Sequence, residues 1–289
     1  MIENANSSPE VIGGMYDNVT EFFLEALGGS IHYGYWHDGD DASSISQASH
    51  QMTSLMINKA GVTADHHVLD IGCGAGMPAV DLAEETGARV TGITISAQQV
   101  RLANQLAESR GLAGRAAFQR ADAADLPFAA GTFDSAWLFE SLLHMPDPGR
   151  VLREAARVMR HDARLAIANV VVRRPLGPDE EKLLNAFSGL VQAPSILPLD
   201  CYPALLQESG LELLEISDVS DNSVRRTFEH VNAAAVRLLG TLEDGPSSAA
   251  NKLLKGTREI TAKLAQNTGI GYAIVVARKA THRLMPPPA

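Results

Sequence analysis

The sequence predicts an α/β protein with a doubly wound, mostly parallel seven-stranded sheet, a helical N-terminal lid and an inserted helical cap. Between residues 67 and 172, short apolar runs rich in β-branched residues alternate with amphipathic stretches of helical length. A glycine-rich bend, GCGAG, follows the first of these runs. Strand–helix alternation at this spacing needs crossover connections, and these place successive strands parallel to one another.

The expected elements follow the apolar periodicity along the chain. The strands are expected at His67–Ile71, Arg89–Ile93, Ala116–Arg120, Ser135–Phe139, Arg164–Val172, Leu211–Val219 and Ile270–Ala277. The helices are expected at Pro9–Leu27, Ser46–Ala60, Pro78–Thr86, Gln98–Arg110, Gly149–Met159, Glu180–Val191, Pro203–Ser209 and Val231–Lys263.

These elements divide the chain into parts. We expect a lid over residues 1–60, an α/β core over 61–175, and a helical cap over 176–266 that contains the sixth strand at about 211–219. The last strand lies within 267–280. Residues 281–289 are expected to be a disordered tail, because three consecutive prolines cannot join a helix or a sheet.

Charge and composition indicate the class of partner. The formal net charge is −10, and the basic residues form no cluster larger than the doublets Arg173-Arg174 and Arg225-Arg226. Nucleic acid is therefore not expected, since its phosphates select clustered Lys and Arg. Two cysteines imply no disulfide framework, and we see neither a secretory leader nor an apolar run of membrane-spanning length. We expect a cytoplasmic protein that acts on a small molecule, without a membrane or metal site, and that forms a homo-oligomer.

The bend HVLDIGCGAGMP indicates the cofactor. Gly72, Gly74 and Gly76 stand at every second position after a strand that carries Asp70 near its end. Glycines let the backbone turn sharply and approach a ligand without a Cβ clash. A plain tight turn is the alternative, and three glycines after an acidic residue disfavour it. An acidic side chain here suits a ligand that carries an ammonium group, as methionine does.

Dinucleotide binding is the rival interpretation of this bend. Its pattern is G-x-G-x-x-G with an acidic residue some 20 positions later on the ribose hydroxyls. Here the third glycine comes one position early, and the second strand ends in GITIS without a carboxylate. Both departures weigh against NAD, and Asp70 beside the glycines favours S-adenosyl-L-methionine (SAM), with S-adenosyl-L-homocysteine (SAH) as its product.

Three stretches carry a family resemblance. DIGCGAG resembles the first motif of the Rossmann-like class I methyltransferases, and ADAADLPFAAGTFDSAWLFESLLHMPD resembles their adenine-side acidic loop and fourth strand. MYDNVTEFFLEALGGSIHYGYW resembles the N-terminal segment of sterol C-methyltransferases, tocopherol methyltransferases and rebeccamycin-type sugar O-methyltransferases. The resemblance covers residues 15–175 well and the cap poorly.

The resemblance implies a set of cofactor-binding residues. They are Asp70, Gly72, Gly74 and Gly76 at the methionine half, Thr94, Ser96 and Gln99 at the ribose, Asp122 and Ala123 at the adenine, and Phe139, Tyr16 and Tyr33 around the sulfonium. Core packing is the alternative for Phe139. The crowding of Tyr33 with other rings in HYGYWH favours a solvent-shielding lid.

The acceptor is inferred from what this chain lacks. The similar sugar O-methyltransferases carry a His-His pair and an Asp, whose positions here correspond to Leu143, His144 and Asn169. Because Leu and Asn cannot accept a proton at neutral pH, we expect an alkene carbon of a prenyl or terpenoid natural product, methylated through a carbocation. Glu140 would stabilise that cation or take its proton, and His144 is the second candidate.

Other interpretations remain open. Tyr202, in an apolar stretch of the cap, could face the cation. Glu140 could instead bind a backbone amide or a lid tyrosine, and His144 could be structural. A diphosphate acceptor would need basic groups, for which the two arginine doublets are the candidates. The alternative functions are O-methylation of a sugar or polyketide hydroxyl with His144 as base, and a non-catalytic SAM-binding partner.

Overall fold

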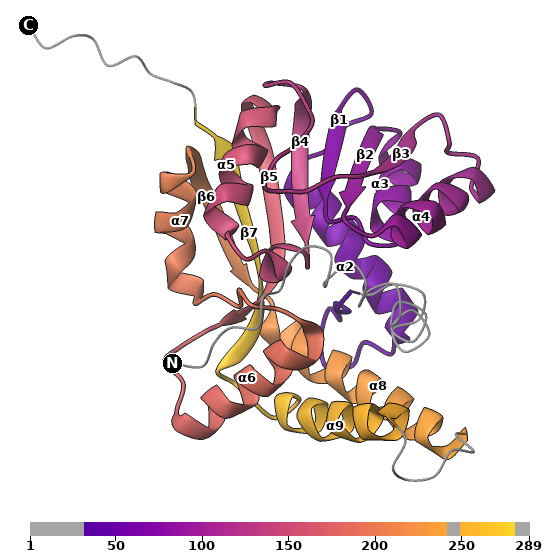
Figure 1. The fold of residues 1–289 in the computed structure, drawn as a ribbon, viewed down its shortest axis with the longest axis vertical. Coiled ribbons are helices and arrows are strands. Elements are labelled where there is room, and N and C mark those ends of the chain that lie inside the picture. Colours follow the sequence, from indigo (N-terminus) through magenta and orange to yellow (C-terminus); the bar gives the residue numbers. More distant parts are fainter. Residues whose placement is uncertain (1–31, 242–248, 281–289) are drawn as a thin grey trace, which may run out of the picture.

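The structure is a computed structural model, and it describes residues 32–241 and 249–280. Its centre is a seven-stranded sheet in the order β3-β2-β1-β4-β5-β7-β6 (Figure 1). The strands are β1 (His67–Ile71), β2 (Arg89–Thr94), β3 (Ala116–Arg120), β4 (Phe133–Phe139), β5 (Met159–Val172), β6 (Leu211–Asp218) and β7 (Ile270–Lys279). Among these, β7 alone runs antiparallel to its neighbours, β5 and β6.

The described helices are connected to this sheet as the alternation of the sequence predicts. They are α2 (Ile45–Ala60), α3 (Met77–Thr86), α4 (Ala97–Ser109), α5 (Pro148–Val158), α6 (Pro178–Val191), α7 (Tyr202–Glu208), α8 (Ser220–Thr241) and α9 (Ala249–Leu264), with 3-10 turns η1 (Leu142–His144) and η2 (Leu199–Cys201). None of them is long and apolar enough to cross a membrane.

The predicted fold class is confirmed, and all seven strands lie where apolar runs were found. One helix prediction is wrong: Val231–Lys263 is not one helix but the end of α8 and most of α9, and α8 begins eleven residues earlier, at Ser220. Apolar periodicity could not locate the start of α8, because its first residues, SDNSVRR, include only one aliphatic residue. The predicted helix Pro9–Leu27 and the tail 281–289 lie outside the described residues.

Both faces of the sheet are buried, as a largely parallel sheet requires. Successive β4 side chains alternate between the faces: Trp137 and Phe139 pack in one cluster, and Ala136 and Leu138 pack in the other. Helices α2 and α3 cover the first face, and α5 and α7 cover the second. The position of a residue along the strand therefore determines which face of the sheet its side chain occupies.

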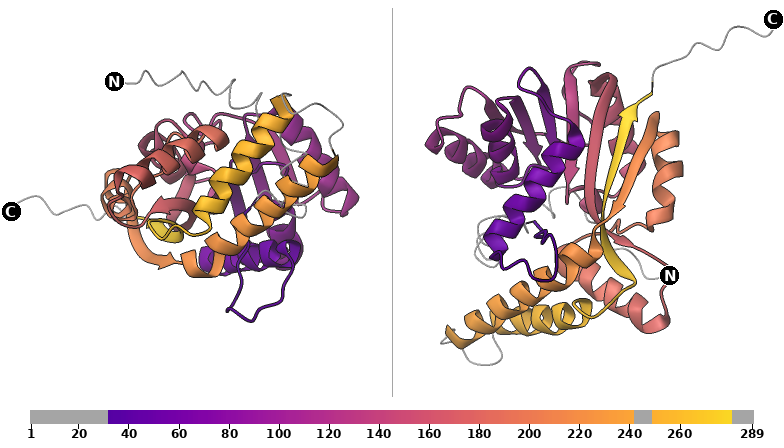
Figure 2. Two further views of the ribbon diagram at one scale, coloured as in Figure 1. Left: turned by 90° about the horizontal axis from the view of Figure 1, so that it is seen from below. Right: turned by 180° about the vertical axis from the view of Figure 1, so that it is seen from behind.

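The cap lies beyond the carboxyl ends of the parallel strands. Helices α8 and α9 run side by side there, and α6 packs against α9 (Figures 1 and 2). Strands β1 and β4 are adjacent in the sheet, so the chain order reverses between them. Ligands of open α/β sheets bind outside the strand ends at such a reversal.

Candidate active site

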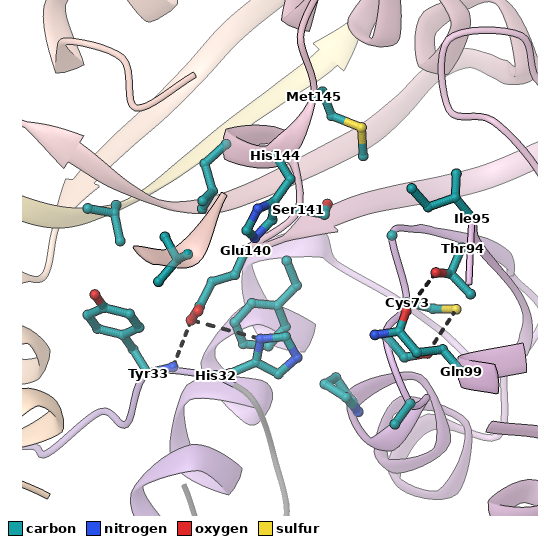
Figure 3. Close-up of a pocket in the computed structure, with 18 of the residues that line it drawn as sticks. His32, Tyr33, Cys73, Thr94, Ile95, Gln99, Glu140, Ser141, His144 and Met145 are labelled. Carbon is teal, nitrogen blue, oxygen red and sulfur yellow. Dashed lines mark hydrogen bonds and ion pairs between the residues drawn. The ribbon is translucent and has the colours of Figure 1, made fainter. Parts of the chain in front are cut away.

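A cavity occupies this position. One end is lined by the glycine bend after β1, the end of β2, the loop after β3 and the turn after β4. The other end is lined by α6, α8 and α9. The chain at His32 and Tyr33 also lines the cavity (Figure 3). The cavity thus lies between the carboxyl ends of the parallel strands and the helices of the cap.

The three glycines of the bend have two different structural roles. All have positive φ, of 86° at Gly72, 54° at Gly74 and 88° at Gly76. A Cβ at Gly72 would lie 2.4 Å from the Cβ of Ser141, and one at Gly76 would lie 2.6 Å from that of Ala103. A Cβ at Gly74 would meet nothing within 4 Å. Gly72 and Gly76 therefore permit close packing of the chain on itself, whereas Gly74 presents bare backbone to the cavity.

Asp70 lies behind this bend. Its side chain is buried, and its Oδ1 atom has no hydrogen-bond partner within the described residues. Burial raises the pKa of Asp70 to about 7, against the opposing effect of the nearby Trp137 indole. An unpaired buried carboxylate oxygen is costly unless a ligand satisfies it. Asp70 does not itself line the cavity, but its unsatisfied oxygen lies directly behind the lining glycine bend, where a ligand with an ammonium group, such as the methionine half of SAM, would fit.

The end of β2 forms the next part of the wall. The Thr94 hydroxyl donates to Oε1 of Gln99 at 2.7 Å, and both residues line the cavity (Figure 3). Ser96 does not line it; its hydroxyl instead accepts from the backbone N–H of Gln99 and caps α4. Asp122 and Ala123 line the cavity on the β3 side. No carboxylate stands at the end of β2, which is the difference from a dinucleotide site.

Aromatic rings bring the N-terminal chain onto the sheet. Phe139 lines the cavity, and its ring stacks on His32 at 4.1 Å between centroids with 15° between planes. Tyr33 also lines the cavity and stacks on Tyr272 of β7 at 4.8 Å. Burial lowers the pKa of His32 to about 3, so this ring is neutral. His32 had no role in the sequence prediction, although it lies in the aromatic cluster that indicated a lid.

Glu140 follows Phe139 at the end of β4. Its Oε1 atom accepts hydrogen bonds from the backbone N–H of Tyr33 and from the hydroxyl of Tyr272, both at 2.7 Å (Figure 3 shows the Tyr33 contact). Burial raises the pKa of Glu140 to about 8. Of the two interpretations left open by the sequence, this geometry matches binding to a backbone amide and a tyrosine.

His144 lines the cavity from η1, next to Leu143. Its Nδ1 atom lies 3.1 Å from the carbonyl oxygen of Gln192. Because a carbonyl can only accept, Nδ1 carries the proton and Nε2 of the neutral ring is unprotonated. Burial lowers the pKa of His144 to about 4, so the neutral form prevails at physiological pH. The geometry therefore provides a group able to accept a proton.

Tyr202 does not face the cavity: it is buried on the opposite face of the sheet, where its hydroxyl accepts from the amide of Asn169 at 3.3 Å. The prediction that Tyr202 faces a cation is therefore corrected. Asn169 is one strand position before Val170, which does line the cavity, so the pleat turns Asn169 away. Tyr16 lies outside the described residues.

The cap end of the cavity is apolar, and no Lys or Arg lines it among the described residues. Phe187 of α6 and Phe228 and Val231 of α8 line it, and Thr257 of α9 adds a hydroxyl. Phe187 belongs to the apolar cap stretch AFSGLVQAPSILPLDCYPALL, which the sequence predicts as a pocket wall, whereas sequence reasoning missed Phe228, Val231 and Thr257. The spacing of Thr257 and Thr261, one helical turn apart on the buried face of α9, was the available signal.

The arginine doublets are engaged outside the cavity. Arg173 pairs with Asp218, Arg174 with Glu180, Arg225 with Glu229, and Arg226 lies over the ring of Trp36 at 4.6 Å. They form no phosphate site in this cavity.

Comparison with known proteins identifies the family. Residues 69–167 match the family model described as a methyltransferase domain. The methyltransferase GfsG of Streptomyces halstedii is 42% identical over 81% of this chain and 84% of its own length. The chain belongs to the class I SAM-dependent methyltransferases. The 27-O-demethylrifamycin SV methyltransferase of Amycolatopsis mediterranei is 34% identical over 94% of this methyltransferase and 98% of the relative.

A solved structure agrees with the fold. The crystal structure of the [4+2]-cyclase SpnF superposes with a TM-score of 0.81 at 30% identity, over 95% of this methyltransferase and 97% of that chain. The predicted enzyme class, cofactor and fold are thereby confirmed. SAM supplies an electrophilic methyl group on a sulfonium, and the residues described above provide the bend, the buried carboxylate and the aromatic cover that suit it.

Proposed function

We propose that this methyltransferase methylates a hydroxyl group of an uncharged, lipophilic natural product, with His144 as the general base. The observation that carries the proposal is the contact of His144 Nδ1 with the Gln192 carbonyl oxygen. This contact places the ring proton on Nδ1, so that Nε2 is the basic nitrogen of a side chain that lines the cavity. The sequence favoured an alkene because two of three basic groups were replaced. One of those positions, Asn169, faces the other side of the sheet, so its identity does not bear on this cavity.

The proposed chemistry needs one proton acceptor. The acceptor oxygen forms a bond to the methyl carbon, the carbon–sulfur bond breaks with its electron pair on sulfur, and the hydroxyl proton passes to Nε2 of His144. A positioned base of this kind contributes a factor of ~10² to 10⁴ in rate. The cap and the chain at Tyr33 line the same cavity, and a cover that keeps water from the reacting atoms would support this displacement.

The lining of the cavity supports an uncharged acceptor. No Lys or Arg contributes to the wall among the described residues, and a diphosphate would need several. The name of the Amycolatopsis relative, which acts on 27-O-demethylrifamycin SV, supports a natural-product hydroxyl. The aliphatic and aromatic side chains of α6 and α8 suit a lipophilic skeleton.

An alkene carbon is the second candidate acceptor. The rings of Phe139, Phe187 and Phe228 line the cavity, and aromatic faces stabilise a cation by ~0.5–2 kcal/mol each. A prenyl or terpenoid acceptor would use them. His144 would then take the final proton.

Methyl-labelled SAM distinguishes the candidates. The protein is incubated with labelled SAM and a panel of neutral polyketide alcohols, glycosides, prenylated indoles and sterols, and the labelled carbon is assigned by NMR. We expect label on oxygen, whereas label in a C–CH3 group would establish the second candidate instead. Geraniol and geranyl diphosphate form a matched pair: a preference for the diphosphate would overturn the uncharged acceptor.

A further inference from the structure

The N-terminal chain borders the cavity at His32 and Tyr33, and we define residues 32–36 as the strap. Four backbone N–H groups tie it to other elements, and one of them is that of Tyr35, which donates to the carbonyl of Ala48 on α2 at 2.8 Å. Tyr33 donates to Glu140 at 2.7 Å, Gly34 donates to the hydroxyl of Thr227 at 3.1 Å, and Trp36 donates to the carbonyl of Asn222 at 2.9 Å. Two of these anchors are on α8, and Glu140 is the anchor on the sheet.

Glu140 holds an unusual backbone conformation. Its φ is 50°, in the left-handed region that costs a non-glycine residue roughly 1 kcal/mol or more. Its N–H still donates to the carbonyl of Ala168 at 2.8 Å, so the chain stays paired with β5 through this turn. A glycine would adopt this conformation without strain, so the side chain must offset the cost.

The side chain joins three elements through one oxygen. Oε1 accepts from the Tyr33 amide of the strap and from the Tyr272 hydroxyl of β7, while the backbone belongs to the end of β4. The two donors come from residues 107 and 132 positions away in the chain. Tyr33 and Tyr272 also stack on each other, so the two donors reach Glu140 as one packed unit.

The position of the strap determines whether its side chains His32 and Tyr33 line the cavity. His32 stacks on Phe139 while the next residue, Tyr33, is held by Glu140, and both His32 and Tyr33 contribute to the cavity wall. We propose that Glu140 is a positioning residue, which holds the strap over the cavity through Tyr33 and Tyr272 and neither removes the acceptor proton nor stabilises a cation. This inference rests on the proposed function in one respect: the cavity beside the strap is taken to be where methyl transfer occurs.

A comparison of Glu140→Gln with Glu140→Ala tests this role. The amide oxygen of Gln can accept both hydrogen bonds but carries no charge and is not a base. Hydrogen exchange of the strap amides is measured by mass spectrometry, together with the Kd for SAH and with methyl transfer. We expect Gln to keep all three within about threefold of the wild type. We expect Ala to speed strap exchange and weaken SAH binding, each about tenfold, because the opening free energy falls.

Tyr272→Phe provides a variant that keeps the packing. It removes one of the two hydrogen-bond donors to Glu140. We expect it to speed hydrogen exchange of the strap amides, as Glu140→Ala does, but by a smaller factor. Lys182→Ala, which breaks an exposed ion pair with Asp179 on α6, serves as the control and should match the wild type.

Two results would overturn the proposal. One is a Glu140→Gln enzyme as inactive as Glu140→Ala while its strap exchanges at the wild-type rate, since the charge would then be needed in the chemistry. The other is unchanged strap exchange in both Glu140→Ala and Tyr272→Phe. Exchange and SAH binding need no acceptor, so these readouts hold even if hydroxyl methylation proves wrong.

Discussion

The side-chain amide of Asn169 donates to the hydroxyl of Tyr202 at 3.3 Å, on the face of the sheet opposite the cavity. Both residues are buried, and the Oδ1 atom of Asn169 has no partner within the described residues. Burial raises the pKa of Tyr202 to about 12, so its hydroxyl stays protonated. This pair is a feature of the core and not of the reacting centre.

Asn169→Asp should therefore fail to create a catalytic base. The change places a carboxyl in a buried site whose polar partner is a single hydroxyl, and we expect a loss of ~1–3 kcal/mol in stability at pH 7. Urea unfolding measures the loss, and methylation of a hydroxyl panel measures activity. A gain of hydroxyl methylation would contradict the placement of Asn169.

Gly74→Ala should weaken SAH binding without a clash inside the protein. Its Cβ would enter the open cavity, and we expect a loss of at least tenfold in affinity by calorimetry. Gly131→Ala is the matched control, because Gly131 has a φ of 67°, open space around its Cβ and no part in the cavity wall. Both variants should lose a similar ~1 kcal/mol from backbone strain. Equal SAH affinity in the two variants would show that Gly74 does not face the cofactor.

His144→Gln should slow methyl transfer by a factor of ~10² to 10⁴ and leave the Kd for SAH nearly unchanged. Because the pKa of His144 is about 4, kcat at saturating SAM and acceptor should stay level from pH 6 to 8 and fall only toward pH 4. A wild-type inflection near the ordinary histidine value of 6.5 would indicate a solvated ring instead. Full activity of the variant would remove His144 as the base.

Asp70 should give the protein a pH-dependent stability. Its pKa is about 7 in the folded state and 3.8 when unperturbed, so the folded state binds the proton more tightly than the unfolded chain. Its contribution is therefore largest below pH 4 and is lost as the pH rises through 7. Between pH 5 and 8 the wild type should lose ~2 kcal/mol of stability relative to Asp70→Asn. Urea titrations at the two pH values measure this, and a difference that grows in the opposite direction would exclude a buried, protonated Asp70.

Local features of the fold could be predicted from the sequence. The strand His67–Ile71 and the helix after Met77 follow from apolar periodicity and from the glycine bend, and these depend on neighbours a few residues away. The helix boundary at Ser220 could not, because tertiary packing, and not local hydrophobicity, makes that polar turn helical.

The sequence by itself determined the strand–helix order, the glycine bend beside Asp70 and hence the class of cofactor, since each is set by residues close together in the chain. Tertiary structure alone decided that Asn169 and Tyr202 lie behind the sheet, that His32 covers Phe139, and that Glu140 holds Tyr33. The physical reason is that these relationships depend on the pleat of β5 and on packing between segments up to 107 residues apart, and no local pattern records either.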